Sequence, residues 1–287
     1  MKAMFLSVLV LFSVLISNVG HAALSSQEIP YYGEEFYRDL ATGVSNEELV
    51  SRLQTVLRSS HQAVSGTYDQ ISDNCTSQGC YQHISLGYDR ARIFMMGVYY
   101  LVKDGNSYAI PDLYCGGYKR SADFTSNPPG PNQIPDGNIL NTEHTWPQSR
   151  FTGKFNKMMQ KSDLHHLYPT DSEMNSIRGN NEFGEVVKDS KNLKCPVSRT
   201  GKPAGGGAEV FEPPVSHRGN VARALFYFSV RYGLPIGERQ ENTLRKWNKE
   251  DPVDEEEVRR NDAILKVQGN RNPFVDYPEL ADKISNF

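Results

Sequence analysis

The first 22 residues decide where the rest of the chain folds. One cation, Lys2, precedes an apolar run from Ala3 to Val19 that contains serines and one asparagine, and Gly20-His21-Ala22 follows. This pattern predicts a cleavable secretory signal over residues 1–22. The interrupted run is too short for a membrane-spanning helix, which needs roughly 18 to 20 clean apolar residues. We therefore expect residues 23–287 to fold outside the cytoplasm, in the periplasm or the extracellular medium, without a membrane anchor.

Export makes disulfide bonds available to the four cysteines. Cys75 and Cys80 are five positions apart, which suits a small loop staple and leaves Cys115 and Cys195 for a longer bridge. Three pairings are possible in principle. The chain has no Cys-x-x-Cys spacing of the kind found in zinc sites, so disulfides are favoured over a metal cluster.

The overall charge does not indicate a nucleic-acid partner. The chain has 31 Lys and Arg against 34 Asp and Glu, a formal net charge of −3. A strongly basic balance is the usual signature of a protein that binds a polyanion. Any such site must therefore be a local patch.

Hydrophobic periodicity predicts a mixed α+β fold in which helices dominate. No internal repeat and no clean linker divides residues 23–287, so we predict a single domain, with residues 23–44 as a loosely packed lead-in. Apolar spacing predicts helices, and turn-forming residues predict loops. The expected helices are 45–59, 88–103, 220–232 and 255–267, and the expected loops are 116–138 and 200–208.

Glu143 and Asn175 are candidate ligands for a hard cation. A carboxylate and an amide oxygen, completed by waters and substrate phosphate, suit octahedral Mg²⁺, whereas zinc prefers nitrogen and sulfur. Mn²⁺ and Ca²⁺ remain open. Asn175 falls in a short predicted helix that starts with a capping box of Thr170 and Glu173 and ends at Gly179.

His144 is the candidate general base, because a neutral imidazole accepts a proton from water near pH 7. Its neighbour Glu143 poses a geometric difficulty, since adjacent side chains of a regular strand point to opposite faces. The two converge only if the strand ends there, which Pro147 favours.

Two further groups of residues flank this cluster. A helical segment would place four cations in one stripe, either a solvated face or a surface that follows phosphates; they are Arg150, Lys154, Lys157 and Lys161. Asp163, His165 and His166 match no common zinc spacing, so we expect them to orient and pack neighbouring residues.

Several ordered motifs resemble the secreted bacterial endonuclease I family, whose active site is a ββα-metal finger. The resemblance covers about residues 85–280. Its motifs are Glu143-His-Thr-Trp-Pro-Gln-Ser149, Asp163-Leu-His-His-Leu-Tyr-Pro169, Asn175 with Arg178 and Asn180, Phe211-Glu-Pro-Pro214, Gly219-Asn-Val-Ala-Arg-Ala224 and Gln268-Gly-Asn-Arg-Asn-Pro-Phe274.

The resemblance implies a metal-dependent, largely sequence-non-specific endonuclease that cleaves DNA, and often RNA, to 5′-phosphate and 3′-hydroxyl ends. His144 would be the general base, oriented by a backbone carbonyl near Lys161, and Glu143 and Asn175 would hold Mg²⁺. An arginine would contact the scissile phosphate, with Arg150 the first candidate and Arg178 the second.

Three functions stay open at this point. The first is a monomeric, secreted endonuclease acting on double- and single-stranded DNA, and the second is an RNA-preferring nuclease with the same site. The third is a secreted binding module in which Glu143, His144 and Asn175 hold a structural ion. Asn270-Arg271-Asn272-Pro273-Phe274 could pack against the finger or contact phosphate.

Overall fold

The computed structural model describes residues 28–287. The predicted signal, residues 1–22, and the start of the predicted lead-in lie outside the described residues. Within the described part, no helix combines the length and the apolar character needed to span a bilayer.

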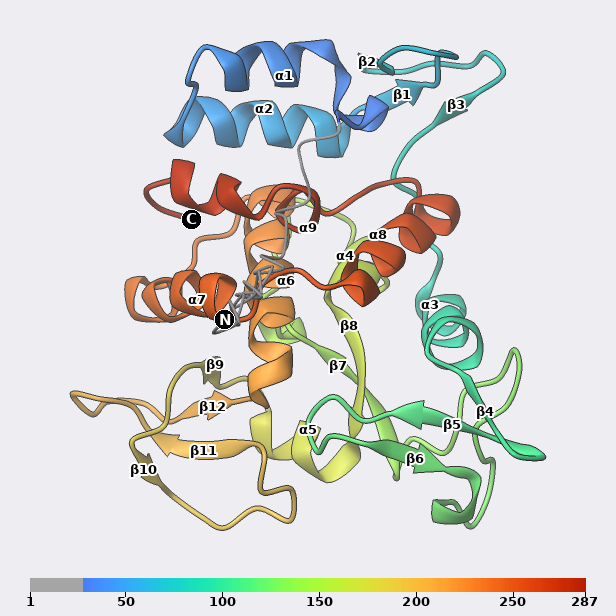
Figure 1. Ribbon diagram of the computed structural model, residues 1–287, viewed down its shortest axis with the longest axis vertical. Helices are drawn as coiled ribbons and strands as arrows, with labels where there is room; N and C mark the ends of the chain where they lie inside the picture. The colour runs from blue at the N-terminus through green and yellow to red at the C-terminus, as the bar shows by residue number, and fades with distance from the viewer. Residues whose placement is uncertain (1–27) are drawn as a thin grey trace, which may run out of the picture.

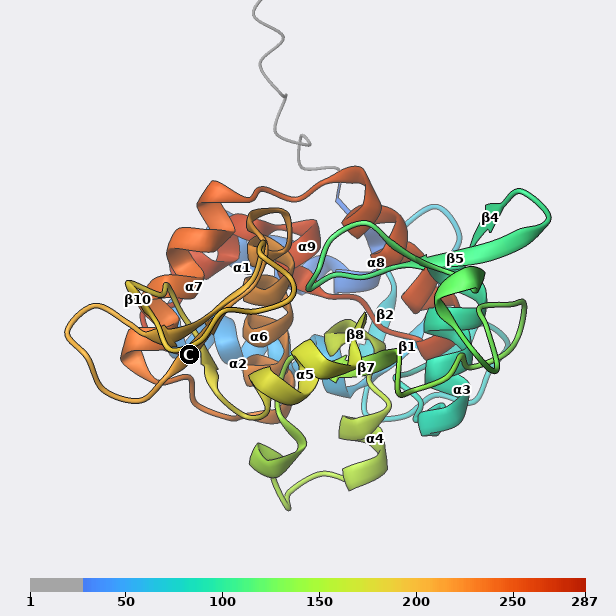
Figure 2. The ribbon, with the colours of Figure 1, turned by 90° about the horizontal axis from the view of Figure 1, so that it is seen from below.

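A long buried helix, α6, organises the molecule. It runs from Arg218 to Tyr232, and Figures 1 and 2 place it in the middle of the other elements. All its residues from Gly219 onward are buried, as expected for a helix surrounded by protein. Gly219 is required by close packing, because a Cβ atom there would lie 2.0 Å from the carbonyl oxygen of Asp251. The helix ends at Gly233, whose left-handed backbone (φ 65°) closes the last turn.

The other helices surround α6, and most predicted helices are confirmed. Their bounds are α1 Gly33–Ala41, α2 Asn46–Arg58, α3 Tyr88–Phe94, α4 Lys157–Lys161, α5 Ser172–Arg178, α7 Glu238–Glu250, α8 Glu255–Gln268 and α9 Pro273–Asp276. The helix predicted over 88–103 is shorter, because α3 continues as a π-helix only to Tyr99. Sequence reading missed α7, whose large apolar residues are just Leu244 and Trp247; both are fully buried.

The prediction of a loosely packed lead-in is wrong for the described part of residues 23–44. Helix α1 lies beside α2 in Figure 1, and Tyr31, Tyr32 and Phe36 are buried in the main core. The Tyr32 hydroxyl donates a hydrogen bond to Asp276, which anchors this segment to the C-terminal region. Its many polar residues suggested a loop, but burial of three aromatic rings outweighs them.

Four small sheets complete the α+β fold. Their strand orders are β2-β1-β3, β4-β5-β6, β7-β8 and β10-β11-β12-β9, and only the β12–β9 pair is parallel among the described strands. The bounds are β1 Ser60–Gln62, β2 Gln70–Ser72, β3 Cys80–Tyr81, β4 Val102–Asp104, β5 Ser107–Pro111, β6 Tyr118–Arg120, β7 Leu140–His144, β8 Leu167–Asp171, β9 Glu182–Phe183, β10 Lys188–Asp189, β11 Arg199–Lys202 and β12 Val210–Glu212. The expected loop 116–138 therefore contains one short strand, and 200–208 begins in another.

Strands β7 and β8 and helix α5 form a ββα unit. The strands pair antiparallel from Leu140 opposite Asp171 to His144 opposite Leu167, and α5 follows β8 directly. The predicted capping box is wrong in its cap residue. Asp171, and not Thr170, caps α5 by accepting hydrogen bonds from the amides of Glu173 and Met174.

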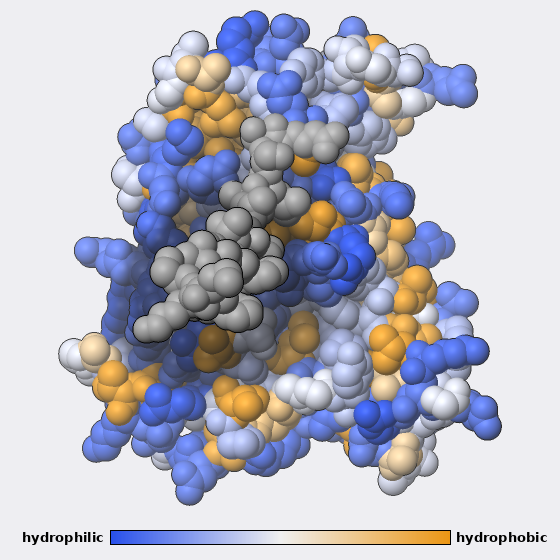
Figure 3. All heavy atoms as spheres, viewed as in Figure 1, coloured by the Kyte–Doolittle hydropathy of each residue, from blue (hydrophilic) through white to orange (hydrophobic). Residues whose placement is uncertain are grey.

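Two disulfides pair the cysteines as Cys75–Cys80 and Cys115–Cys195. The first closes a loop in the N-terminal part, and the second joins the segment after β5 to the segment before β11. On the face shown in Figure 3, hydrophobic residues form small separate areas among hydrophilic ones, outside the part covered in grey. The disulfides thus reinforce a fold whose apolar side chains are largely collected in its core.

Candidate active site

A pocket of about 320 Å³ opens where β7 ends and the last turn of α5 passes beside it. Four predicted site residues line it: Glu143, His144, Asn175 and Arg178. Glu143 and His144 reach the same pocket because β7 ends at His144, as the nearby proline suggested. The geometric difficulty posed by adjacent strand residues is resolved in this way.

The carboxylate of Glu143 is buried and is held on one side. Its Oε1 atom accepts a hydrogen bond of 2.7 Å from the Tyr114 hydroxyl and another of 2.7 Å from Arg178 Nη1. Burial raises the pKa of Glu143, although Arg178 and Tyr114 oppose that rise. Both side-chain donors reach Oε1, so Oε2 is the oxygen left for a cation in the pocket.

The imidazole of His144 is oriented by a backbone carbonyl. Its Nε2 atom lies 3.1 Å from the carbonyl oxygen of Lys161, so Nε2 carries the proton and donates. The lone pair is then on Nδ1, which Gln148 Nε2 approaches at 3.4 Å. Burial lowers the pKa of His144 well below its usual value, so the ring is neutral near pH 7 and Nδ1 can accept a proton.

Asn175 is positioned by its amide nitrogen. Nδ2 donates a 3.1 Å hydrogen bond to the carbonyl oxygen of Thr142, one residue before Glu143 on β7. The amide group is thereby fixed, and its acceptor oxygen is available as a neutral ligand. Glu143 and Asn175 therefore offer two hard oxygen atoms from adjacent elements, the donor set that Mg²⁺ prefers.

The structure argues against Arg178 as a phosphate contact. The residue is 1% exposed, and its guanidinium lies over the Phe183 ring. Besides Glu143, it donates hydrogen bonds to the carbonyl oxygens of His144 (2.8 Å) and Thr145 (2.7 Å). Its two terminal nitrogens, Nη1 and Nη2, thus hold the end of β7, and a sequence pattern could not reveal this because the partners are 33 to 35 residues away.

Arg150 lies at the pocket edge with an exposed side chain. It donates a 3.0 Å hydrogen bond to the carbonyl oxygen of Asn180, which lines the pocket, and is 3.5 Å from Glu182. The predicted cation stripe is wrong, because only 148–150 and 157–161 are helical and 151–156 are not. Arg150 therefore does not share a helix face with the three lysines. Its exposed side chain makes it a better candidate than Arg178 for a contact with phosphate.

Comparison with known proteins identifies the family of the chain. The sequence profile described as Endonuclease I matches residues 80–279. The chain belongs to the endonuclease I family. Among curated relatives, the extracellular ribonuclease of Bacillus amyloliquefaciens is 40% identical over 163 residues, which cover 50% of this chain and 53% of that protein.

Two further relatives come from Aeromonas hydrophila. One is named extracellular deoxyribonuclease and is 35% identical over 43% of this chain and 51% of its own length. The other is named periplasmic deoxyribonuclease and is 34% identical over 44% of this chain and 51% of its own length. The chain thus spans about half the length of the curated relatives it matches. The match to the endonuclease I family begins at residue 80, after α1, α2, β1 and β2.

The residues of the motif 163–169 lie in the protein interior next to the pocket. Asp163 is buried and accepts hydrogen bonds of 2.8 Å from the hydroxyls of Tyr227 and Tyr232. His166 lies against the His144 ring, with centroids 5.3 Å apart, and its Nε2 is 2.8 Å from the Gln160 carbonyl. His165 lies with its ring centroid 4.6 Å from that of Tyr227, so the contacts of Asp163, His165 and His166 agree with the orienting and packing roles predicted for them.

The segment 270–274 packs and does not face the pocket. Asn270 donates to the Tyr227 hydroxyl, and Asn272 donates to the carbonyl oxygen of Arg223 at 3.0 Å. Arg271 pairs with Asp276 and Asp262, each at 2.7 Å. The segment therefore packs, chiefly on α6, and it touches the segment between β7 and β8 through the Asn270 carbonyl oxygen, which lies 3.3 Å from His165 Nε2.

Three residues near the site escaped sequence reading. Tyr88 lines the pocket, and its ring lies tilted beside that of His144, with centroids 5.4 Å apart. The Lys161 ammonium lies 4.3 Å from the Tyr88 centroid. Gln148 approaches His144, and Tyr114 contacts Glu143 from 29 positions upstream. Only Gln148 carried a sequence signal, because it lies inside the motif that begins at Glu143.

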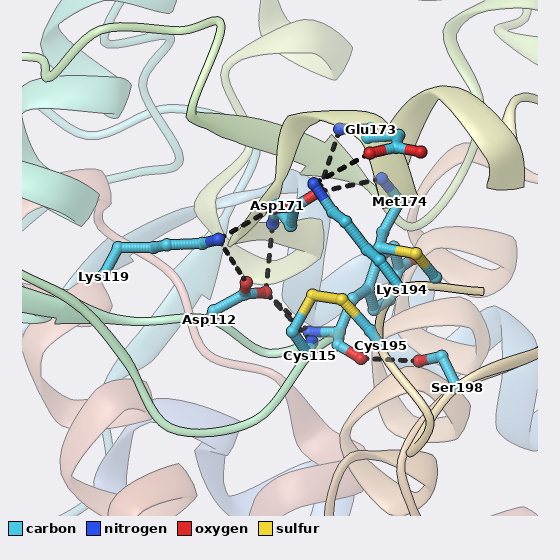
Figure 4. Close-up of a disulfide and its surroundings, with 10 residues drawn as sticks. Asp112, Cys115, Lys119, Asp171, Glu173, Met174, Lys194, Cys195 and Ser198 are labelled. Carbon is cyan, nitrogen blue, oxygen red and sulfur yellow. Dashed lines mark hydrogen bonds and ion pairs between the residues drawn. A yellow bond between two sulfur atoms is a disulfide. The ribbon is translucent and has the colours of Figure 1, made fainter. Parts of the chain in front are cut away.

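A second polar pocket lies at the other end of α5. It measures about 430 Å³ and is lined by Asp112, Asp171, Lys119 and Lys194, beside the Cys115–Cys195 disulfide (Figure 4). Ligand atoms of Asp112, Cys115 and Asp171 lie within 4.8 Å of one another. The Cys115 sulfur is bonded to Cys195, however, and Asp171 pairs with both lysines. This group is thus a weaker candidate for a metal than the Glu143 pocket.

Proposed function

We propose that this protein is a secreted, metal-dependent, largely sequence-non-specific endonuclease that hydrolyses DNA phosphodiesters to 5′-phosphate and 3′-hydroxyl ends. One observation carries the proposal: the free oxygens of Glu143 and Asn175 and the basic nitrogen of His144 belong to side chains of a single pocket. Membership of the endonuclease I family supports it.

The residues of the pocket fit a hard divalent cation. Glu143 and Asn175 would hold Mg²⁺, with Mn²⁺ and Ca²⁺ as alternatives, because both present oxygen ligands whose other polar atoms are already bonded. Burial leaves the Glu143 carboxylate incompletely compensated, as its raised pKa indicates, so a nearby cation would be favourable. When bound, the ion would supply positive charge to the phosphate undergoing substitution.

His144 would activate the attacking water. The Lys161 carbonyl fixes the proton on Nε2, so Nδ1 accepts a proton as the water oxygen forms its bond to phosphorus. The bond from phosphorus to the 3′ oxygen then breaks, and that oxygen takes a proton from solvent water, which leaves a 5′-phosphate and a 3′-hydroxyl. Arg150, at the pocket edge, would bind a phosphate oxygen of the substrate.

An RNA-preferring nuclease with the same pocket is the second candidate. Proteins named extracellular ribonuclease, from Bacillus amyloliquefaciens and Bacillus subtilis, are 40% and 38% identical to the matched part of this chain. The pocket residues do not distinguish the sugars, since neither hydrolysis by water nor phosphate binding needs a 2′-hydroxyl. A metal-holding binding module is the third candidate and predicts no turnover.

Incubation of the purified protein with circular duplex DNA and with structured RNA separates these candidates. Each substrate receives Mg²⁺ or excess EDTA, and products are followed on gels with end-group analysis. We expect Mg²⁺-dependent nicking of DNA to 5′-phosphate ends. Faster cleavage of RNA would establish the second candidate, and a folded, metal-loaded protein that cleaves neither polymer would leave the binding module.

We also infer export of the protein. The predicted signal over residues 1–22, the two disulfides and the relatives named extracellular or periplasmic support this inference. Cell fractionation with N-terminal sequencing tests it: we expect a mature protein that starts at Ala23. A full-length chain retained in the cytoplasm would contradict export.

A further inference from the structure

Tyr114 contacts Glu143 from outside the ββα unit. Its side chain is fully buried, and its hydroxyl donates the 2.7 Å hydrogen bond to Oε1 of Glu143. Arg178 donates to the same oxygen at the same distance. Because both side-chain donors bind Oε1, the other carboxylate oxygen, Oε2, is the one that Glu143 offers to the pocket. The Tyr114 hydroxyl thus helps to fix which oxygen is offered.

The backbone around Tyr114 is fixed on several sides. Its amide donates to Asp112 Oδ1 at 3.1 Å, and its carbonyl accepts a 2.6 Å hydrogen bond from the Ser198 hydroxyl. The next residue, Cys115, is bonded to Cys195, as Figure 4 shows. The Tyr114 ring packs on Phe211 with centroids 4.7 Å apart. The hydroxyl therefore has little freedom to leave Glu143.

We propose that Tyr114 is a positioning residue that makes Glu143 a one-oxygen ligand and thereby favours Mg²⁺ or Mn²⁺ over Ca²⁺. This inference rests on the proposed role of Glu143 as a metal ligand. Ca²⁺ takes six to eight oxygens and often binds both oxygens of a carboxylate, whereas Mg²⁺ takes six in a tight octahedron. A carboxylate whose second oxygen already accepts two hydrogen bonds suits the smaller ion.

The variant Tyr114→Phe tests the proposal, because it removes the hydroxyl and keeps the ring. Binding of Mn²⁺ is measured from the electron paramagnetic resonance signal of the free ion, and binding of Mg²⁺ and Ca²⁺ is measured by competition. Loss of a hydrogen bond to a metal ligand typically weakens metal affinity about 10- to 100-fold. We expect Mn²⁺ and Mg²⁺ to lose about 10-fold and Ca²⁺ to lose less, so the preference moves toward Ca²⁺.

Tyr32→Phe is the matched control. This variant also removes a hydrogen bond from a fully buried tyrosine to a carboxylate, that of Asp276. Tyr32, however, lies just before α1 and does not line the Glu143 pocket. We expect it to lower the melting temperature and to leave all three affinities unchanged. If Tyr114→Phe folds and binds the three ions like the unmodified protein, the proposal is overturned.

Glu143→Gln separates this inference from the proposed function. If Glu143→Gln binds Mn²⁺ normally, Glu143 is not a ligand and both proposals fail. If Glu143→Gln loses Mn²⁺ while Tyr114→Phe does not, only the role of Tyr114 fails.

Infrared spectroscopy of the unmodified protein gives a test that does not depend on the folding of Tyr114→Phe. The separation of the two carboxylate stretching bands is larger for one-oxygen than for two-oxygen coordination, and Glu143→Gln assigns the bands. We expect the one-oxygen pattern with Mg²⁺ and also with Ca²⁺. A two-oxygen pattern with Mg²⁺ would contradict the proposal.

Discussion

The buried carboxyl groups at the two ends of α5 have pKa values shifted in opposite directions. At the N-terminal end, Asp171 is 2.8 Å from the Lys119 ammonium and 2.9 Å from that of Lys194. Burial opposes ionisation there, but the lysines dominate and lower the pKa of Asp171. At the C-terminal end, Arg178 pairs with Glu143, and burial still raises the pKa of that carboxyl.

The difference lies in the direction from which the counter-ion comes. Lys119 and Lys194 line the pocket at the N-terminal end, so their ammonium groups occupy the positions that a cation would take. Arg178 is buried, and it donates hydrogen bonds both to Glu143 and to two backbone carbonyl oxygens. Its guanidinium is therefore a part of the packed interior. The acidic residues at the N-terminal end are thus already paired with lysines, whereas both side-chain donors to Glu143 use the same oxygen, Oε1.

The largest expected effect is loss of turnover in His144→Ala. Removing a general base costs about 10²- to 10⁴-fold in rate, while the metal ligands remain. Lys194→Met, at the other end of α5, is the matched control and should cleave within a few-fold of the normal rate. Cleavage rates on plasmid DNA, with melting temperatures to confirm folding, provide the measurement. Normal turnover in His144→Ala would remove this residue from the mechanism.

Adding a divalent metal should stabilise the protein by binding in the Glu143 pocket, at the C-terminal end of α5, and not in the pocket of Asp112 and Asp171. An ion that binds the folded state at about 100 times its dissociation constant adds about 2.7 kcal/mol to the free energy of unfolding. We expect urea titrations to show this gain in the unmodified protein and in Asp112→Asn, but not in Glu143→Gln. The reverse pattern would place the ion in the pocket of Asp112 and Asp171.

Asp171→Ala should lower stability by about 1–2 kcal/mol, because Asp171 caps α5 with hydrogen bonds of 3.0 and 3.1 Å to two amides. Lys194→Met breaks only ion pairs of a lysine whose side chain is 46% exposed, and such pairs contribute about 0–1 kcal/mol. Urea midpoints compare the two variants. An equal or smaller effect of Asp171→Ala would show that α5 does not depend on this cap.

The smallest expected effect concerns pH. Because the folded pKa of Asp171 is lowered, its charge stabilises the fold above the unfolded pKa of about 3.9, and this contribution is lost as pH falls below it. Asp171→Asn keeps a capping oxygen but removes the charge, so its stability should fall less steeply with acid. The difference in slope is at most about 1.4 kcal/mol per pH unit.

Asp189→Asn is the control for the acid titration. Asp189 also has a lowered pKa, from its pairing with Arg199, but it is an exposed residue of β10. Solvent screens this exposed ion pair, so its lowered pKa is linked to little stability, and we expect no measurable change of slope in urea midpoints between pH 3 and 5. Equal slopes for both variants and the unmodified protein would mean that the lysines at the N-terminal end of α5 do not set the acid response.

Local patterns predicted most of the helices and the composition of the pocket. Apolar spacing located α2 and α6, whereas α8 is a charged helix that was located from Asp254 and Gly269 at its ends. The same method missed α1 and α7, in which a few large buried side chains do the packing and the remaining positions are polar. It also merged Arg150 with three lysines into one stripe, since charge spacing alone does not show where a helix is interrupted.

The sequence by itself determined the chemistry available to this protein. The order of Glu143, His144 and Asn175, the proline after them and the four cysteines are local facts, and they were sufficient to predict candidate ligands for a hard cation; the ββα unit was expected only from the resemblance to the endonuclease I family. Only the tertiary structure decided how these groups are used. It buried Arg178 against Glu143 and brought Tyr114 to the same carboxylate oxygen. It also placed two lysines beside Asp171 in the wall of the other acidic pocket. The physical reason is that such partners lie tens of residues apart, and their meeting depends on the packing of whole elements.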